Sequence, residues 1–353
     1  MNPTTASTPR LADVARLAGV SLATASRVLN GSTRKVAESY QRRVLEAAEE
    51  LGYTANLSAQ ATARGTAGII ALLVADIADP YFSNIAAGVA RMADEAGLVV
   101  TIATTNRDPA REAALLQTLR GQRPRAVILA ASRSGTPIAE AASHLIASGS
   151  TVVALGHDDD PDVRWLGVDN HGGARLLGTE MVGLGYRRAI ILAAGEGIRT
   201  SDDRIAGFTE GFTAGGGREP IVRRTGFDRE GGKEAMADLI AEGYVSNAGE
   251  PTLVFAISDV MAVGALRAIR AADLTIGRQV SVCGFDDITT AIDVTPELTT
   301  VHIPLAELGY QAAALAIDSE APAPELPLSV TVRASTPPVP PSGAGEGNDR
   351  HAS

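Results

Sequence analysis

Eight short apolar runs, each about as long as a β-strand, constrain the fold of this chain more than any other feature. They are rich in Val, Ile, Leu and Ala, and segments with helical periodicity separate them. Near-continuous runs of this kind are typical of strands that are buried on both faces of a parallel sheet. Two series of such runs predict two doubly wound α/β lobes, with a ligand cleft at the carboxyl ends of the strands. The first series lies at 69–75, 98–104, 126–131 and 151–155, and the second at 189–194, 221–224, 253–256 and 280–284.

Three helices are predicted upstream of these runs. Apolar side chains recur at helical spacing over 11–18, and Gly19 suits the left-handed conformation that ends a helix. Ser21 is a good N-cap for a second helix that reaches Leu29, and a third helix covers 38–51. Two short helices joined by a glycine-containing turn indicate a helix-turn-helix unit, although the pattern alone also fits a generic three-helix bundle. The residues of the third helix expected to face the other two are Val44, Leu45, Ala48 and Leu51.

The charge distribution sets this head apart from the rest of the chain. Residues 1–64 carry eight basic and five acidic side chains, whereas the whole chain has a net charge of −10. A basic head on an acidic body suggests that the head alone binds a polyanion such as DNA. Arg42 and Arg43 in the third helix are candidates for contacts with phosphate groups.

The strings LADVARLAGVSLATASRVLNG and RRVLEAAEELGYTAN closely resemble the head of the LacI/GalR (lactose-repressor) family of bacterial transcription regulators. In a helix-turn-helix unit the second helix enters the major groove of DNA. The resemblance implies that Leu22 and Ala23 contact base edges and that Arg27 is the third recognition residue. An arginine can bind guanine through two hydrogen bonds, and small apolar side chains can pack on thymine methyl groups. The resemblance further implies DNA-backbone contacts for Thr24, Ser26 and Asn30.

A short hinge helix is predicted between head and body, from a cap at Asn56 to Gly65. In the family that this chain resembles, the hinge helix forms on the operator and an apolar leucine wedges into the minor groove. This chain has Thr62 at that position, and threonine offers less apolar surface for wedging between base pairs. We therefore expect weaker bending of the operator, and a Thr62→Leu variant that binds operator more tightly in a gel-shift titration. The hinge residues expected to bind DNA are Asn56, Ala59, Gln60 and Thr62.

The resemblance continues through the body, in the strings VADIADPYFSNIAAGV, RIAGF, SDVMAVGALRAI, VSVCGFDD and PELTTVHIP. It implies a two-lobed, periplasmic-binding-protein-like body with an effector pocket between the lobes. Carboxylates and an arginine beside aromatic rings suit a sugar, because the charged groups bind hydroxyls and the rings pack on the apolar sugar face. The implied effector-binding residues are Asp79, Tyr81 and Phe82 of the first lobe, Arg204, Phe227, Asp259 and Asp286 of the second, and His157 as a weaker candidate.

Several of these residues also have a purely structural interpretation. Asp259 could be the N-cap of the following helix, Tyr81 and Phe82 could belong to the core, and His157 could lie in a solvated acidic loop. Arg204 and Asp286 stand in strong motifs, so ligand contact is the favoured interpretation for both.

These segments predict the domain organisation. The head covers 1–53 and the hinge 54–65, and no leucine heptads follow the body, so a homodimer that reads a pseudo-palindromic operator is expected rather than a tetramer. A Pro/Gly/Ser-rich tail at 334–353 is expected to be disordered. The body covers 66–333, with a first lobe of about 66–166 plus 301–323 and a second lobe of about 167–295 plus 326–333.

Other classes of protein fit the sequence less well. A Gly-rich phosphate loop in the required context, HExxH and GxSxG are all absent, and a single cysteine, Cys283, excludes an intramolecular disulfide. We expect no enzyme, no metal and no cofactor. The N-terminus lacks an apolar signal segment and the longest apolar stretch, 68–75, is too short for a bilayer, so no membrane partner and a cytoplasmic, nucleoid-associated location are expected. The alternative to a repressor controlled by a sugar is a sugar-binding transport protein, which shares the two-lobed body but lacks the DNA-binding head.

Overall fold

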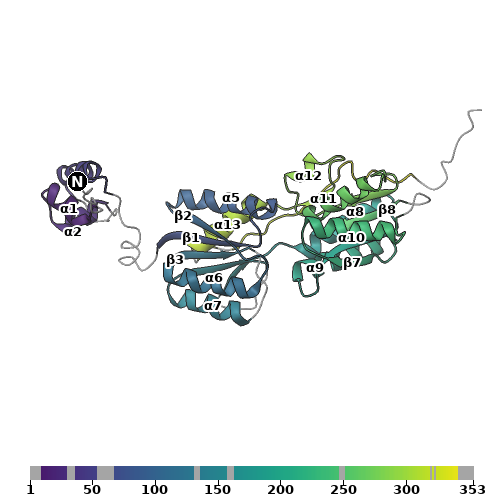
Figure 1. Ribbon diagram of the computed structural model, residues 1–353, viewed down its shortest axis with the longest axis horizontal. Coiled ribbons are helices and arrows are strands. Elements are labelled where there is room, and N and C mark those ends of the chain that lie inside the picture. The colour runs from purple at the N-terminus through teal and green to yellow at the C-terminus, as the bar shows by residue number, and fades with distance from the viewer. Residues whose placement is uncertain are drawn as a thin grey trace, which may run out of the picture.

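The computed structural model describes residues 9–29, 36–53, 67–130, 136–156, 163–245, 251–318, 320, 321 and 323–340. A helical head is followed along the chain by two α/β lobes (Figure 1). The predicted fold class, an all-α helix-turn-helix head with a two-lobed body of two parallel sheets, is confirmed. No helix among the described residues is long and apolar enough to cross a membrane.

The head is built from three helices around a small core of its own. Gly19 has a φ of +61°, and the N–H of Thr24 donates to Ser21 Oγ over 3.1 Å, so the predicted turn and N-cap are confirmed. Fully buried side chains from all three helices meet in the core, namely Val14, Ala25 and Val44. The helices are α1 (Leu11–Leu17), α2 (Leu22–Leu29) and α3 (Glu38–Glu50).

One side chain of α3 differs from the prediction, and a second has a structural role. Leu45 is 55% exposed, because Val44, Ala47 and Ala48 form the inward stripe and the next residue along a helix points about 100° away. Arg43 donates hydrogen bonds to the carbonyl oxygens of Ala18 and Gly19 at the carboxyl end of α1. Its guanidinium therefore caps α1, and the contact of Arg43 with a phosphate group stays a prediction.

The first lobe is a five-stranded parallel sheet with helices on both faces. The strand order is β2-β1-β3-β4-β5, and Leu72 and Ile128, on the neighbouring strands β1 and β3, are fully buried. Helices α5 and α13 pack together on one face, whereas α6 and α7 pack on the other (Figure 1). The strands are β1 (Ala67–Val74), β2 (Val99–Thr104), β3 (Pro124–Leu129), β4 (Thr151–Leu155) and β5 (Arg164–Leu166). The helices are α5 (Pro80–Glu95), α6 (Pro109–Gln122), α7 (Thr136–Ala147) and α13 (Leu305–Ile317).

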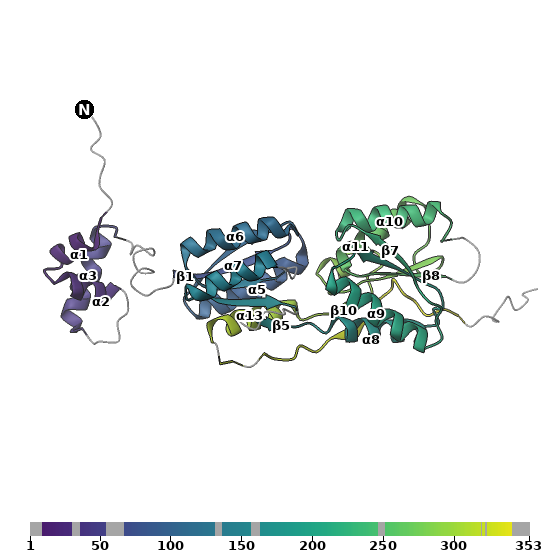
Figure 2. The ribbon, with the colours of Figure 1, turned by 90° about the horizontal axis from the view of Figure 1, so that it is seen from below.

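The second lobe repeats this plan with four parallel strands in the order β7-β6-β8-β9. Helices α8 and α9 cover one face, and α10 and α11 cover the other (Figure 2). The strands are β6 (Ala189–Ala194), β7 (Ile221–Thr225), β8 (Thr252–Ala256) and β9 (Val280–Cys283). The helices are α8 (Asn170–Gly183), α9 (Arg199–Ala214), α10 (Arg229–Ala241), α11 (Asp259–Ala271) and the short α12 (Thr290–Asp293).

Glycines allow the helices of each pair to approach closely. A Cβ atom on Gly88 of α5 would lie 1.8 Å from the carbonyl oxygen of Ala306, and one on Gly207 of α9 would lie 2.0 Å from that of His171. Neither position can carry a larger residue without moving one backbone away from the other. Both lobes therefore use the same device to pack a helix pair on the sheet.

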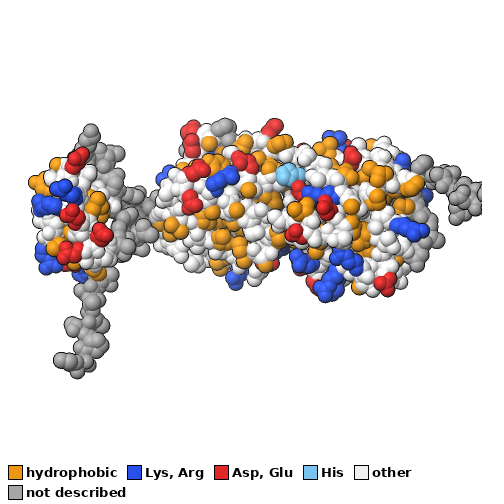
Figure 3. Space-filling model, turned by 90° about the horizontal axis from the view of Figure 1, so that it is seen from above, with side chains coloured by type: hydrophobic (Ala, Val, Ile, Leu, Met, Phe, Trp, Pro, Cys, Tyr) orange, Lys and Arg blue, Asp and Glu red, His pale blue; other side chains and the backbone are white. Residues whose placement is uncertain are grey.

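The chain passes between the lobes more than once. After the second lobe it returns through β10 (Thr300–His302) to α13 in the first lobe, and it then comes back through β11 (Ser329–Thr331). Strands β10 and β11 pair in antiparallel fashion. Acidic and basic side chains and a histidine gather on the surface where the lobes meet (Figure 3). Asp287 joins the segments around β10 and β11, because its two carboxylate oxygens contact His302 Nδ1 at 2.9 Å and Arg333 Nη2 at 2.8 Å.

The prediction that the disordered tail starts at residue 334 is wrong. Ser335 and Thr336 are fully buried, and Ser335 Oγ donates to the carbonyl oxygen of Val282 over 2.6 Å. The hydroxyl of Tyr186 donates to the carbonyl oxygen of Pro337 over 2.8 Å. Residues 334–340 thus pack on the second lobe, because small polar side chains can satisfy buried backbone groups without any apolar periodicity. Residues 341–353 lie outside the described part of the chain.

Candidate functional site

Helix α2 presents the side chains that the sequence predicts for base contacts. Leu22 is 54% exposed, Ala23 and Arg27 are exposed, and Ala25 between them is fully buried. Burial of Ala25 fixes which side of α2 faces the core, so the three exposed residues share the outer side. Thr24 and Ser26 are partly buried, and the Thr24 hydroxyl lies 2.8 Å from that of Ser21.

The outer side of α2 can contact DNA with one guanidinium and two apolar groups. Arg27 has the geometry for a bidentate contact with guanine, and Leu22 and Ala23 can pack on thymine methyl groups. The remaining predicted residues of the head and hinge, and one of the effector residues, lie outside the described part of the chain: Asn30, Asn56, Ala59, Gln60, Thr62 and His157.

A cleft of about 620 Å³ lies between the two lobes, at the carboxyl ends of both sheets. This is the position that the rule for open α/β sheets predicts, and the volume falls in the usual range for small-molecule sites of ~300–1,000 Å³. Six of the predicted effector residues line it: Asp79, Tyr81, Phe82, Arg204, Phe227 and Asp286. Their assignment as effector contacts stays a prediction.

The polar centre of the cleft is an ion pair between Arg204 and Asp286. Arg204 Nη1 lies 2.9 Å from Asp286 Oδ1, and the side chains are only 3% and 6% exposed. The guanidinium is fixed from other sides, because Nε donates to Asn170 Oδ1 over 2.8 Å and Nη1 donates to the carbonyl oxygen of Ile257 over 2.6 Å. It also lies 3.8 Å from the centroid of the Phe285 ring.

Asp286 Oδ1 has no aligned hydrogen-bond donor among the described residues, although Arg204 is close. The contact is an ion pair between two buried side chains, and Nη1 also donates to the carbonyl oxygen of Ile257. A buried carboxylate oxygen without a donor can accept a hydrogen bond from a ligand hydroxyl. The pair therefore combines a fixed cation with a carboxylate in the lining of the cleft.

Burial controls the protonation of the carboxyl groups in the cleft. It raises the pKa of Asp286 to about 7, and the charge of Arg204 opposes this rise. Burial also raises the pKa of Asp79, against the hydrogen bond that its carboxylate accepts from the Tyr81 N–H over 3.0 Å. The pKa of the Tyr81 hydroxyl is raised by burial and by the charge of Asp286, so the phenol stays neutral.

The backbone of Asp286 is strained. Its φ is +112°, in a region that residues other than glycine rarely adopt. Such a backbone conformation costs about 1–3 kcal/mol of stability. The Asp286 N–H donates to the carbonyl oxygen of Val301 over 2.9 Å, so strand β10 helps to hold this conformation. Asp286 thus stands in a strained conformation in the lining of the cleft.

Asp259 does not line the cleft, in contrast to its predicted role. It is fully buried at the first residue of α11, after Ser258 as the N-cap. One carboxylate oxygen accepts from Thr300 Oγ1 over 2.7 Å and the other from the Ile288 N–H over 3.0 Å. Both oxygens are thus occupied within the fold, and burial together with the charge of Asp286 raises the pKa of Asp259.

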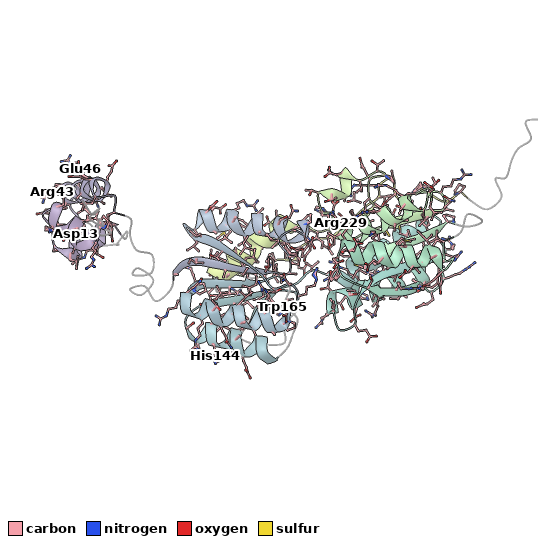
Figure 4. The ribbon with its side chains drawn as sticks, viewed as in Figure 1. Asp13, Arg43, Glu46, His144, Trp165 and Arg229 are labelled. Carbon is pink, nitrogen blue, oxygen red and sulfur yellow. The ribbon has the colours of Figure 1, made fainter. Side chains whose placement is uncertain are left out.

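Sequence reasoning missed several residues of the cleft, above all Arg107 and Trp165. The Arg107 guanidinium comes from the first lobe and lies 4.6 Å from the ring centroid of Phe227 in the second. This contact separates the main cleft from a smaller hollow of about 550 Å³ that also includes Asp79 and Arg229. Trp165 and Arg229 lie at facing edges of the two lobes (Figure 4).

A positional signal could have found these residues. Arg107 follows β2, and Trp165 stands in β5, close to where this strand ends. Residues at or after the carboxyl ends of parallel strands line the ligand crevice of an open α/β sheet. The same signal marks further residues of the cleft after β6, namely Glu196, Arg199, Thr200 and Asp203.

Comparisons with known proteins agree with this geometry. Residues 10–56 match the family described as bacterial regulatory proteins, lacI family, and residues 179–336 match the periplasmic binding protein-like domain. The chain is 30% identical over 306 residues to the HTH-type transcriptional regulator DegA of Bacillus subtilis, covering 85% of this chain and 88% of DegA. It is also 30% identical over 318 residues to the HTH-type transcriptional regulator GalR of Escherichia coli, covering 89% and 90%.

Two solved structures of transcription regulators are similar to this chain over most of its length. The lac repressor dimer bound to operator and the anti-inducer ONPF has a TM-score of 0.79 at 25% identity, covering 93% of this chain and 99% of that one. The complex of the transcriptional regulator CelR with cellobiose has a TM-score of 0.66 at 29% identity, with the same coverage. The curated relatives named here are transcription regulators rather than enzymes.

Proposed function

The chain belongs to the LacI family of bacterial DNA-binding transcription regulators, and from this premise we propose that it is a repressor whose operator affinity is set by a sugar in the interlobe cleft. Two copies of α2 in a homodimer read the half-sites of a pseudo-palindromic operator. Binding of the sugar changes how the lobes close on each other, and so changes the affinity for DNA. Such coupling is reciprocal between the two sites and typically worth ~1–3 kcal/mol.

The observation that carries the proposal is the buried Arg204–Asp286 pair at the centre of an open cleft. A rigid guanidinium and a carboxylate side by side in the lining of the cleft suit adjacent hydroxyl groups of one ligand. Phe82 and Phe227 line the same cleft and supply apolar surface for the face of a sugar ring. Sugars bound to related proteins support this choice of ligand, namely cellobiose on CelR and ribose on a LacI-family regulator from Enterococcus faecium.

The test joins ligand binding to DNA binding in the full chain. A panel of sugars and nucleobases is screened by thermal shift, and each hit is added to a gel-shift titration with a fragment of the promoter that the protein binds. We expect at least one sugar to raise the melting temperature and to change the operator affinity. A protein that binds sugars but retards no promoter fragment would instead support the transport-protein alternative.

The Arg204→Ala variant assigns the response to the cleft. We expect it to bind operator as the unmodified chain does and to lose the response to the sugar. Since this change also removes donors from Asn170 and Ile257, a melting curve must show that the variant is folded. Arg223→Ala is the matched control, because Arg223 pairs with Glu242 on the surface of the second lobe and does not line the cleft. Unaltered regulation in a folded Arg204→Ala protein would refute the assignment.

A further inference from the structure

The cleft continues beyond the Arg204–Asp286 pair to a rim formed by both lobes. Trp165 of β5 stands on the first-lobe side, and Glu196, Arg199 and Asp203 stand on the second-lobe side. The rim is part of the same continuous cavity as the charged centre. None of the residues of the rim is needed to explain how a single sugar ring binds at Arg204 and Asp286.

The cleft has room for more than one sugar ring. A hexose displaces about six water molecules, on the order of 180 Å³ at ~30 Å³ each. The cleft measures about 620 Å³. A monosaccharide bound at the charged centre would therefore leave most of the cavity, including its rim, filled with water.

Trp165 has the exposure and position of a stacking platform. The side chain is 47% exposed, which is unusual for the largest apolar residue next to a core strand, whereas the following Leu166 is almost fully buried. Gly167 allows the indole of Trp165 to lie close to the backbone, because a Cβ atom there would come within 3.0 Å of the ring. The ring thus lies in the lining of the cleft at its rim and is about half exposed.

The opposite side of the rim is polar. Arg199 Nε lies 3.9 Å from Asp203 Oδ2, and the two side chains are 64% and 43% exposed. The Glu196 carboxylate lines the cleft beside them. An aromatic face opposed by carboxylates and a guanidinium repeats, at a distance from the first set, the combination that binds a sugar at the centre.

We propose that the rim formed by Trp165, Glu196, Arg199 and Asp203 is a second sugar subsite, so that the effector is a disaccharide or a longer oligosaccharide. The inference rests on the proposed function of the cleft and specifies its substrate class. One ring binds at Arg204 and Asp286, and the next ring stacks on the indole of Trp165 with its hydroxyls toward Arg199 and the two carboxylates.

The single tryptophan of the chain makes this inference directly testable. Emission from the full-length protein, excited where only tryptophan absorbs, reports on the rim alone. The probes are glucose with cellobiose and maltose, and galactose with lactose and melibiose, titrated in parallel with thermal-shift measurements. We expect one disaccharide to bind about tenfold or more tightly than its component hexoses, and to change the tryptophan emission where those hexoses do not.

Variants separate the subsite from the rest of the cleft. In Trp165→Ala, calorimetry should show about a tenfold loss of affinity for that disaccharide, with the hexose and operator affinities unchanged. Trp165→Phe keeps an aromatic face and should recover part of the loss, and Trp165→Ala is expected to fold because the side chain is half exposed.

The outcomes distinguish the two proposals. A hexose that binds as tightly as every disaccharide containing it, without a change in emission, would overturn the second subsite and leave the sugar-controlled repressor intact. Failure of all sugars to bind would refute both. Binding of a nucleoside that quenches Trp165, with no sugar bound, would show that the rim stacks a base instead, and would also refute the sugar subsite.

Discussion

The two lobes share one architecture but give the cleft different chemistry. The second lobe supplies a guanidinium and a carboxylate that are almost fully buried, Arg204 and Asp286. The first lobe supplies mainly rings: Phe82 and Tyr81, whose centroids are 5.0 Å apart in an edge-to-face arrangement, and Trp165. The comparison indicates that the second lobe fixes the hydroxyl pattern of the ligand, while the first lobe supplies the apolar surface that closes over it.

Each lobe also has residues of the opposite kind, such as the charged Asp79 and Arg107 in the first lobe and the ring of Phe227 in the second. Arg107 is the cation of the first lobe and Phe227 is a ring of the second, and these two exceptions lie against each other across the cleft. Arg107 also lies 5.9 Å from the ring centroid of Phe82. The guanidinium therefore joins the aromatic surfaces of the two lobes, and its contact with Phe227 is worth on the order of 0.5–2 kcal/mol.

The largest expected effect comes from the second lobe. Asp286→Asn keeps the shape of the side chain and removes the charge that faces Arg204. We expect the effector affinity to fall about a hundredfold or more, because the buried guanidinium then lacks its counter-charge and the ligand loses a charged acceptor. Operator binding without effector should be preserved. Calorimetry with the effector and a gel-shift titration measure the two quantities, and a loss below about threefold would contradict the different roles of the lobes.

A smaller effect is expected from pH, and it should also belong to the second lobe. The pKa of Asp286 is raised to about 7, so the carboxylate that accepts the ligand hydroxyl is lost as the pH falls through that value. Effector affinity should be constant above about pH 8 and should decrease toward about tenfold per pH unit well below pH 7. The control is Asp79→Asn in the first lobe, which should keep this inflection at a somewhat lower pH, because the charge of Asp79 helps to raise the pKa of Asp286. If the inflection disappears in Asp79→Asn, the titrating group is Asp79 of the first lobe and the prediction is wrong.

The contact between Arg107 and Phe227 predicts a still smaller effect. Arg107→Ala removes the cation between Phe82 and Phe227, and we expect effector affinity to fall about fivefold. Arg111→Ala is the matched control, because Arg111 donates to the carbonyl oxygen of Thr104 nearby and does not line the cleft. Equal effects of the two substitutions, measured by calorimetry, would show that Arg107 does not join the lobes.

The smallest effect concerns stability. Between about pH 4 and pH 7 the folded chain keeps a proton on Asp286 that the unfolded chain releases, so the free energy of unfolding decreases as the pH rises through this window. Above pH 7 this contribution to the pH dependence is constant. Denaturant unfolding of Asp286→Asn should show a shallower decrease across the window than the unmodified chain. A steeper decrease in the variant would contradict the buried, proton-binding character of the second lobe.

Much of the architecture could be predicted from the sequence, because periodicity reports burial directly. The continuous apolar runs became the strands of two parallel sheets, and Gly19 and Ser21 marked the turn and the start of α2. Leu45 shows the limit of this reasoning. Hydrophobicity alone assigned it to the core, whereas the smaller Ala47 fits the close packing of the three helices.

The site was predictable only in part, because a residue's identity does not show which way its carboxylate or ring points. Asp79, Arg204 and Asp286 were expected at the cleft and line it, whereas the carboxylate of Asp259, expected there from the same resemblance, binds Thr300 and Ile288 instead. Trp165 was missed because its strand is only three residues long and shows no periodicity. Contacts across the chain, which sequence patterns do not encode, decide each of these cases.

The position of α13 has a consequence for how the chain folds as it is made. Leu305, Leu308 and Ala312 are buried in the first lobe, although they are synthesised after all four strands of the second. Domains generally fold as units while the chain emerges from the ribosome. Synthesis of the first lobe begins before that of the second, but the core of the first lobe is complete only once α13 has been made. The second lobe therefore folds while the first lobe still lacks one of its helices. The face of β3 and β4 that awaits α13 is therefore the surface on which a nascent chain would need protection from aggregation.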